Sequence, residues 1–222
     1  MSARHAARLG VALACLAGCV RLTVPTPHVH EYRIDYPPPQ IDGPPLPVVL
    51  RIAPFRVAAA YAGDAIVYRS GDFETDSYVY HRWATNPGNM IADLLARDFA
   101  ASGRYRAVQQ GPSLLPSDYV LTATIEEIEE RSVATGHSAH LRLRVLLFTS
   151  RAPSGEPVWQ RIYDVDQPCL GMGVSDFVAA MSRAVEGVSA QVQREVYEAI
   201  AERSRDPEVR SQQEVALPTS DS

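Results

Sequence analysis

Residues 65–101 read AIVYRSGDFETDSYVYHRWATNPGNMIADLLARDFAA, and this stretch decides the fold class. Its first half holds two β-type runs, Ala65 to Arg69 and Glu74 to His81, joined across Ser70-Gly71-Asp72, which predicts a hairpin. Its second half, Pro87 to Ala101, has the apolar spacing of an amphipathic helix. A hairpin that runs directly into a helix predicts a mixed α/β domain.

The ends of this helix are marked by residues with clear roles. Pro87 suits the first helical position, because its missing N–H would have no partner there. Asn86 or Thr85 can accept a hydrogen bond from the free amides of the first turn. At the other end Ser102-Gly103 predicts a stop, with Gly103 in the left-handed conformation.

Further elements are expected on both sides of the stretch. Upstream, His30 to Tyr36 alternates as a strand does, and Val48 to Val57 reads as a strand in which Pro54 indicates an edge or a bulge. Downstream, we expect three longer strands, a turn and a long helix: Tyr119–Glu129, Ala139–Thr149, Pro153–Glu156, Val158–Gln167 and Ser175–Arg203. In the strand over 139–149 the aliphatic residues face one way and Arg142 and Arg144 the other.

Composition excludes several classes of protein. The chain has 222 residues, of which 46 % are apolar and 21 % charged, so a fully disordered chain, a collagen and a coiled coil are excluded. No apolar run is long enough to make a polytopic membrane protein. The net charge of −5 argues against nucleic acid as the main partner, because phosphate binding requires a basic face.

The N-terminus has the pattern of a secretory signal. Arg4, His5 and Arg8 form a basic segment, and the apolar run from Leu9 to Leu16 is too short to span a bilayer. The run ends in Leu16-Ala17-Gly18-Cys19, which resembles a bacterial lipobox, in which the Cys thiol carries the lipid. An ordinary signal peptide cut after Ala14 is the alternative.

These features predict the organisation of the chain. We expect a signal peptide over 1–18, a lipidated tether over 19–30, one domain over 31–204 and a disordered tail over 205–222. The second residue of the mature chain would be Val20 rather than Asp, and by similarity to known lipoprotein sorting this favours the periplasmic face of the outer membrane.

Residues that could carry chemistry do not form a recognisable site. His28 and His30 lie beside the tether without a nearby carboxylate pair, and the spacing of His137 and His140 places them on opposite faces of a strand. Cys169 reads as an unpaired thiol rather than a nucleophile. Glu126, Glu127, Glu129 and Glu130 read as a solvated strand end. We therefore expect no catalytic residue, no metal and no cofactor.

Aromatic residues and arginines are dense between residues 68 and 83. Such residues are typical anchors of protein interfaces, although a hairpin that packs its aromatics on the core would look the same. We expect Trp83 to pack on the helix at Ile91 and Leu94. The partner-binding candidates are the residues expected to remain exposed: Arg69, Tyr78, Tyr80 and Arg82.

At these residues the sequence resembles a known family. The lipobox, VYRSG…YVYHRWATNPGNMIADLL, Ser102-Gly103-Arg104-Tyr105 and DYVLTATIEEIEE are similar to the ABC-type transport auxiliary lipoproteins, the PqiC/YmbA-like group, over about residues 19–203. The resemblance implies a single three-layer α/β domain with a mixed sheet and two main helices, and no enzymatic activity. It further implies a lipoprotein, acylated with palmitate-type chains, beside an MCE-type ABC system that moves lipids or other hydrophobic molecules.

Two other functions stay open from the sequence. The protein could be an assembly factor for an outer-membrane complex, or a cell-envelope hydrolase, which would need a nucleophile–base or carboxylate pair. The expected partners are an MCE-type substrate-binding protein or another transport component, together with the membrane. The oligomeric state, including a homo-oligomer, stays open.

Overall fold

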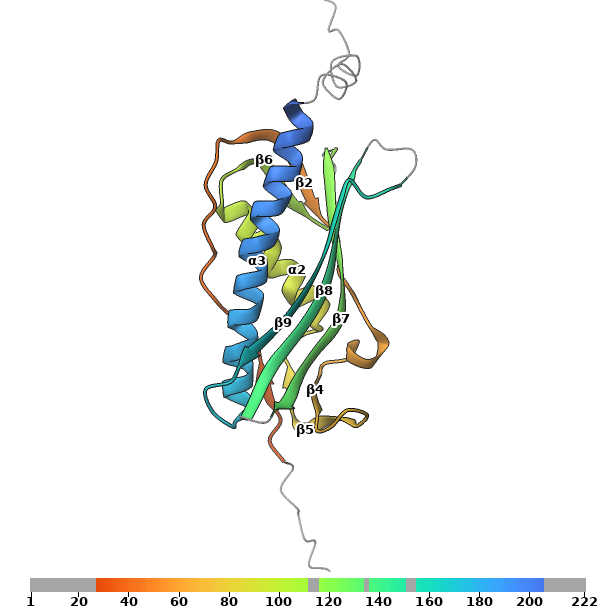
Figure 1. Ribbon diagram of the computed structural model, residues 1–222, viewed down its shortest axis with the longest axis vertical. Coiled ribbons are helices and arrows are strands. Elements are labelled where there is room, and N and C mark those ends of the chain that lie inside the picture. Colours follow the sequence, from red (N-terminus) through yellow and green to blue (C-terminus); the bar gives the residue numbers. More distant parts are fainter. Residues whose placement is uncertain (1–26, 112–115, 134–135, 151–154, 206–222) are drawn as a thin grey trace, which may run out of the picture.

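Nine strands form one mixed sheet in the computed structural model, which describes residues 27–111, 116–133, 136–150 and 155–205 (Figure 1). The elements follow in the order β1 (His30–Tyr32), β2 (Leu46–Ile52), β3 (Arg56–Val57), the 3₁₀ turn η1 (Ala59–Tyr61), β4 (Ala65–Arg69), β5 (Thr75–Trp83), α2 (Pro87–Ala101), β6 (Tyr105–Gln110), β7 (Tyr119–Val133), β8 (Gly136–Thr149), β9 (Trp159–Pro168) and α3 (Val174–Arg205). The expected signal peptide, Cys19, the start of the turn at Pro153 and the tail after Arg205 lie outside the described residues.

The sheet combines parallel and antiparallel pairs. Its path runs β1-β5-β4-β7-β2-β6, while β8 pairs with β7 and β9, and β3 also pairs with β7. The three hairpin pairs, β4–β5, β7–β8 and β8–β9, are antiparallel, and the remaining pairs are parallel. The expected α/β domain with a mixed sheet and two main helices is confirmed.

The core lies between the curled sheet and the helix pair. Helix α3 packs against β8 and β9, α2 packs against β6, β2 and β3, and the two helices contact each other. The inward residues of β8 are fully buried: Leu141, Leu143, Val145 and Leu147. Because each such side chain contributes about 1.5–3 kcal/mol when buried, this face holds the long hairpin on α3. Arg142 and Arg144 point to the other face, as expected.

One buried polar group joins the N-terminal loop to both helices. The Asp98 carboxylate of α2, which is fully buried, accepts hydrogen bonds from the hydroxyls of Tyr36 at 2.8 Å and Ser189 of α3 at 2.6 Å. Arg97 neutralises the same carboxylate at 2.8 Å. Burial and the Asp98 charge both raise the pKa of Tyr36 above its usual range, so its hydroxyl keeps its proton. A satisfied polar group of this kind fixes the relative position of three segments.

The decisive stretch folds as its sequence indicates. Helix α2 has the predicted bounds, the Asn86 side chain accepts from the Gly88 N–H at 2.9 Å, and Gly103 follows with φ of +63°. The hairpin is formed by β4 and β5. Trp83 is buried as expected, and the aromatic ring that it contacts is Phe177 of α3, with centroids 5.9 Å apart.

Two strand predictions were wrong in part, and one strand was not predicted. The strand expected over 30–36 ends at Tyr32, because the N–H of Ile34 bonds to the Met90 sulfur and that of Asp35 to the Ser182 hydroxyl, not to a strand. The strand expected over 48–57 divides at Pro54, which has no N–H, into β2 and β3. Strand β6 was not predicted, because its sequence YRAVQQ lacks an apolar alternation.

Candidate functional site

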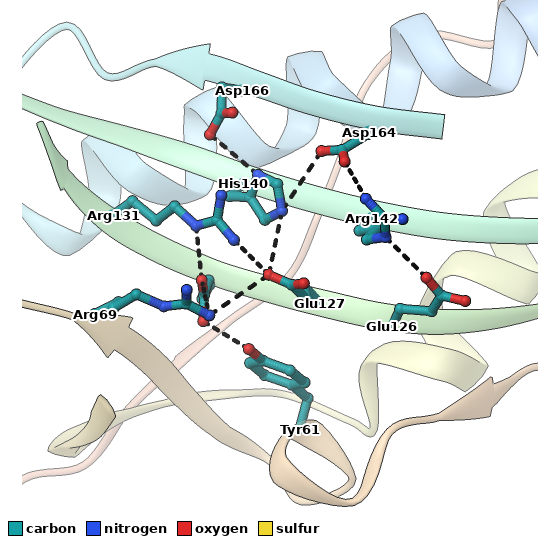
Figure 2. A network of polar contacts seen from close by, with 10 residues as sticks. Tyr61, Arg69, Glu126, Glu127, Arg131, His140, Arg142, Asp164 and Asp166 are labelled. Carbon is teal, nitrogen blue, oxygen red and sulfur yellow. Dashed lines mark hydrogen bonds and ion pairs between the residues drawn. The ribbon is translucent and has the colours of Figure 1, made fainter. Parts of the chain in front are cut away.

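A network of charged side chains covers the face of the sheet that points away from the helices (Figure 2). Its position follows from the strand register, in which Glu127 is opposite Arg142 and Glu129 is opposite His140, with a register shift between Ile125 and Glu127. We call this cluster the outer-face network: Tyr61, Arg69, Glu126, Glu127, Glu129, Arg131, His140, Arg142, Arg144, Asp164 and Asp166.

Glu129 lies at the buried centre of one half of the network. Its carboxylate, which is 0 % exposed, accepts from the Tyr61 hydroxyl at 2.6 Å and pairs with Arg131 at 2.7 Å and with Arg69 at 2.9 Å. Burial would raise the pKa of Glu129, but the hydrogen bonds from Tyr61 and Arg131 and the charge of Arg69 lower it below the ordinary value. Burial and the bond to Glu129 raise the pKa of Tyr61 to about 12. Glu129 is therefore a charged, fully paired group.

The other half of the network is nearer to solvent. Arg142 lies between Glu126, at 2.9 Å, and Asp164, and Arg144 pairs with Glu126 at 2.6 Å. Hydrogen bonds from Arg144 and Arg142 lower the pKa of Glu126. The expectation that the four glutamates form a solvated strand end was therefore wrong. Glu126 has arginines of β8 beside it, Glu129 has Arg69 of β4 and Arg131 of β7, and Glu130 has Tyr78 and His137.

His140, together with Asp164 and Asp166, could ligate a metal ion in this network. It is buried, its Nδ1 lies 3.1 Å from Asp166 and its Nε2 lies 3.7 Å from Asp164, and these three residues bring potential ligand atoms within 4.8 Å of one another. A cation held there would compete with Arg142 for Asp164. His137 lies on the opposite face, 2.6 Å from Glu130, as the spacing of the two histidines predicted.

A second polar group lies on the helix side of the sheet. Buried Glu130 accepts from the Tyr78 hydroxyl at 2.8 Å, and His137 contacts its other oxygen. Burial and the bond to Glu130 raise the pKa of Tyr78 above its usual range. Cys169 lies nearby, and burial together with the Glu130 charge raises the pKa of its thiol. Since the thiolate is the nucleophilic form, this environment disfavours Cys169 as a nucleophile.

The structure separates the four partner-binding candidates into two pairs. Arg69 and Tyr78 were expected to be exposed, but both are half-buried. Arg69 pairs with the buried Glu129, and Tyr78 donates to the buried Glu130. Tyr80 is exposed. Arg82 is also exposed, and it pairs with Glu31 of β1 at 2.6 Å.

Two more large apolar residues of the same hairpin are exposed. The register between β4 and β5 shifts, because Ala65 is opposite Arg82 whereas Val67 is opposite Ser77. Strict alternation is lost in this interval, and Val79 is 79 % exposed beside Tyr80 at 47 %. Phe73, in the turn between the strands, is fully exposed. We call Phe73, Val79, Tyr80 and Arg82 the β5 surface.

Sequence reasoning missed Val79 and Phe73 because it assumed a regular strand and a polar turn. The signal that could have indicated their exposure is the unequal length of the two strands of the hairpin. Strand β5 is longer than β4, and a long strand that faces a short one must bulge or extend beyond it.

The chain is similar to one known protein family and to several solved structures. The family model described as "ABC-type transport auxiliary lipoprotein component" matches residues 34–193. No curated protein matches the chain. In the described residues, no helix combines the length and the apolar character needed to cross a membrane.

Two solved structures share this fold. A crystal structure of a Xanthomonas campestris protein is similar with a TM-score of 0.68 and 21 % identity, covering 82 % of this chain and 97 % of that one. A crystal structure of an uncharacterised protein is similar with a TM-score of 0.61 and 17 % identity, covering 77 % and 99 %.

Proposed function

Because the chain belongs to the family of ABC-type transport auxiliary lipoprotein components, we propose that it is a non-catalytic lipoprotein of the outer membrane that serves an MCE-type ABC system. This system would move lipids or other hydrophobic molecules across the envelope. The protein's part would be to hold a transport component at the membrane surface.

The anchor in this proposal is Cys19. Its lipobox follows a basic segment and a short apolar run, and Val20 favours sorting to the outer membrane. A diacylglyceryl group on the thiol, with palmitate-type acyl chains, would keep the domain at the bilayer, because two or more chains bind a membrane far more tightly than one.

The single observation that carries the docking role is the β5 surface. Val79 and Tyr80 are consecutive exposed residues of β5, and Arg82 is exposed two positions further along the strand. Tyrosine and arginine dominate binding energy in protein interfaces, provided that neighbours exclude water from them. Arg69 and Tyr78 hold the strands that carry this surface. The Arg69–Glu129 ion pair links β4 to β7, and the Tyr78–Glu130 hydrogen bond links β5 to β7. The partner that we propose for this surface is an MCE-type protein.

The absence of catalysis is part of the proposal. What supports it is the pairing of the most buried charged groups: Glu129 is held by two arginines and a tyrosine, and Glu130 by Tyr78 and His137. A general acid or base needs a carboxyl group free to exchange its proton with a substrate. Groups locked in such networks instead hold the sheet together.

The test is a binding assay between the acylated protein and an MCE-type protein of the same organism. Replacing Tyr80→Ala should weaken binding roughly 5- to 30-fold, which corresponds to about 1–2 kcal/mol. The thermal midpoint should stay unchanged, because Tyr80 is exposed. The matched control is Ile162→Ala, which removes an apolar side chain that is 40 % exposed on β9. Equal binding by parent and Tyr80→Ala, or equal loss in both variants, would contradict the proposal.

A further inference from the structure

A loop of unusual composition joins β9 to α3. Between Asp166 and Asp176 the chain reads QPCLGMGVS and contains no charged residue. Two of its large apolar side chains lie in solvent, with Leu170 87 % exposed and Met172 71 % exposed. Large apolar side chains that stay in solvent contribute no burial energy to the domain. Two of them on one loop therefore indicate a contact with something outside the domain.

The loop holds one defined shape. The Cys169 N–H donates to the His137 carbonyl at 2.9 Å, and the Gly173 N–H donates to the Asp176 carboxylate at 3.1 Å. A Cβ on Gly171 would lie 2.4 Å from the same carboxylate, so a larger residue there would displace the Asp176 side chain. The Asp176 carboxylate therefore lies against the loop and stabilises its conformation through the Gly173 N–H. Its charge is directed at the loop backbone, while Leu170 and Met172 face outward.

The loop lies at the same end of the domain as the segment that leads to Cys19 (Figure 1). Figure 1 shows the β9–α3 loop at the lower end of the long axis, the end at which the chain enters the described residues near Pro27. Seven residues lie between Cys19 and Pro27, so eight residue-to-residue steps separate them. Such a segment spans at most ~29 Å when fully extended, at about 3.6 Å per residue. A lipid on Cys19 would therefore keep this end of the domain near the bilayer.

We propose that Leu170 and Met172 insert into the surface of the phospholipid bilayer that holds the acylated Cys19. This inference rests on the anchor in the proposed function. Two apolar side chains on a braced loop without charges match the boundary between headgroups and acyl chains, which lies about 5–10 Å deep. A protein partner would need polar groups at the rim of the patch to define its orientation, whereas a fluid bilayer needs none. The β5 surface, where Arg82 lies beside apolar residues, has that mixed character and stays available for the protein partner.

The experiment measures contact with lipid directly. The acylated full-length protein is reconstituted in vesicles of phosphatidylethanolamine and phosphatidylglycerol that include a phospholipid with brominated acyl chains, which quench tryptophan by contact. One variant is Leu170→Trp, and the matched control is Ser150→Trp, at an exposed position next to the other end of β8, away from the anchor. The signal of the native Trp83 and Trp159 is subtracted with the parent protein.

The expected result is at least threefold stronger quenching of the tryptophan added at position 170 than of that at 150. Met172→Trp is a second, independent variant if Leu170→Trp folds poorly by circular dichroism. If the variants float with the vesicles and the quenching is equal at both positions, the loop does not enter lipid and this inference is overturned, while the anchor stands. If the protein does not float, the anchor itself fails and the inference fails with it. If only an added protein partner shields position 170, the loop is a protein contact and the inference is likewise overturned.

Discussion

Replacing Glu129→Gln should destabilise the protein far more than the same change at Glu126. Glu129 is fully buried and has three partners within 2.9 Å, which are Tyr61, Arg131 and Arg69. Removing its charge leaves two guanidinium groups facing a neutral amide. Breaking a buried charged pair costs about 3–5 kcal/mol. Glu127 still accepts from both arginines, so we expect the lower end, near ~3 kcal/mol.

The assay is thermal and urea unfolding followed by circular dichroism. A loss of ~3 kcal/mol in a domain of this size lowers the midpoint by roughly 6–12 °C. The matched control, Glu126→Gln, removes a carboxylate whose partners Arg142 and Arg144 are partly exposed, so its loss should stay below about 1 kcal/mol. Equal midpoints for the two variants would refute the argument that burial, rather than charge pairing alone, sets the contribution.

The same comparison has a defined pH dependence. The folded-state pKa of Glu129 is lowered, so its ionised form stabilises the fold fully above the unfolded value of 4.5. This contribution is lost as the pH falls through the folded pKa, because both states then bind the proton. The difference in stability between parent and Glu129→Gln should therefore shrink as the pH is lowered below ~4. A difference that stays constant as the pH is lowered further, through the loss of the Glu129 charge, would show that the effect is steric.

Two further changes test the core and the anchor. Trp83→Ala, which removes the indole that packs on Phe177, should cost about 3–5 kcal/mol of stability, measured by the urea midpoint; a loss below ~1 kcal/mol would remove Trp83 from the core. Cys19→Ser should abolish incorporation of radiolabelled palmitate and leave a soluble or uncleaved chain, as measured by fractionation; label retained by this variant would refute the lipobox.

The fold was predictable where local signals suffice. Helix α2 is bounded by Pro87, capped by Asn86 and stopped at Gly103, and all three act within one turn of the chain, so its limits could be read from the sequence. The end of β1 could not be read, because Ile34 and Tyr36 alternate like a strand, whereas the N–H groups of Ile34 and Asp35 bond to side chains of α2 and α3. Only tertiary contacts distinguish a strand from an extended buried loop.

The outer-face network was misjudged for a related reason. Four glutamates within five residues look solvated, because burying a carboxylate is unfavourable unless a cation accompanies it. The cations come from β4 and from elsewhere on the β7–β8 hairpin: Arg69 from β4, Arg131 from β7, and Arg142 and Arg144 from β8. The register shift after Ile125 then decides which glutamate faces which side. Neither the pairing of β4 with β7 nor this shift leaves a pattern in the local sequence.

The two proposed contacts constrain each other through geometry. Strand β5 and the β9–α3 loop both lie at the end of the molecule where the chain enters from the anchor (Figure 1). If Leu170 and Met172 rest in the bilayer surface, the β5 surface is held within reach of the headgroups. A protein partner would then bind close to the membrane plane. That partner would have to span the distance between the membranes, since the eight residue-to-residue steps from Cys19 to Pro27 reach at most ~29 Å at 3.6 Å each. The auxiliary lipoprotein would thus be a binding site held at one membrane, and its partner would extend to it from the other membrane.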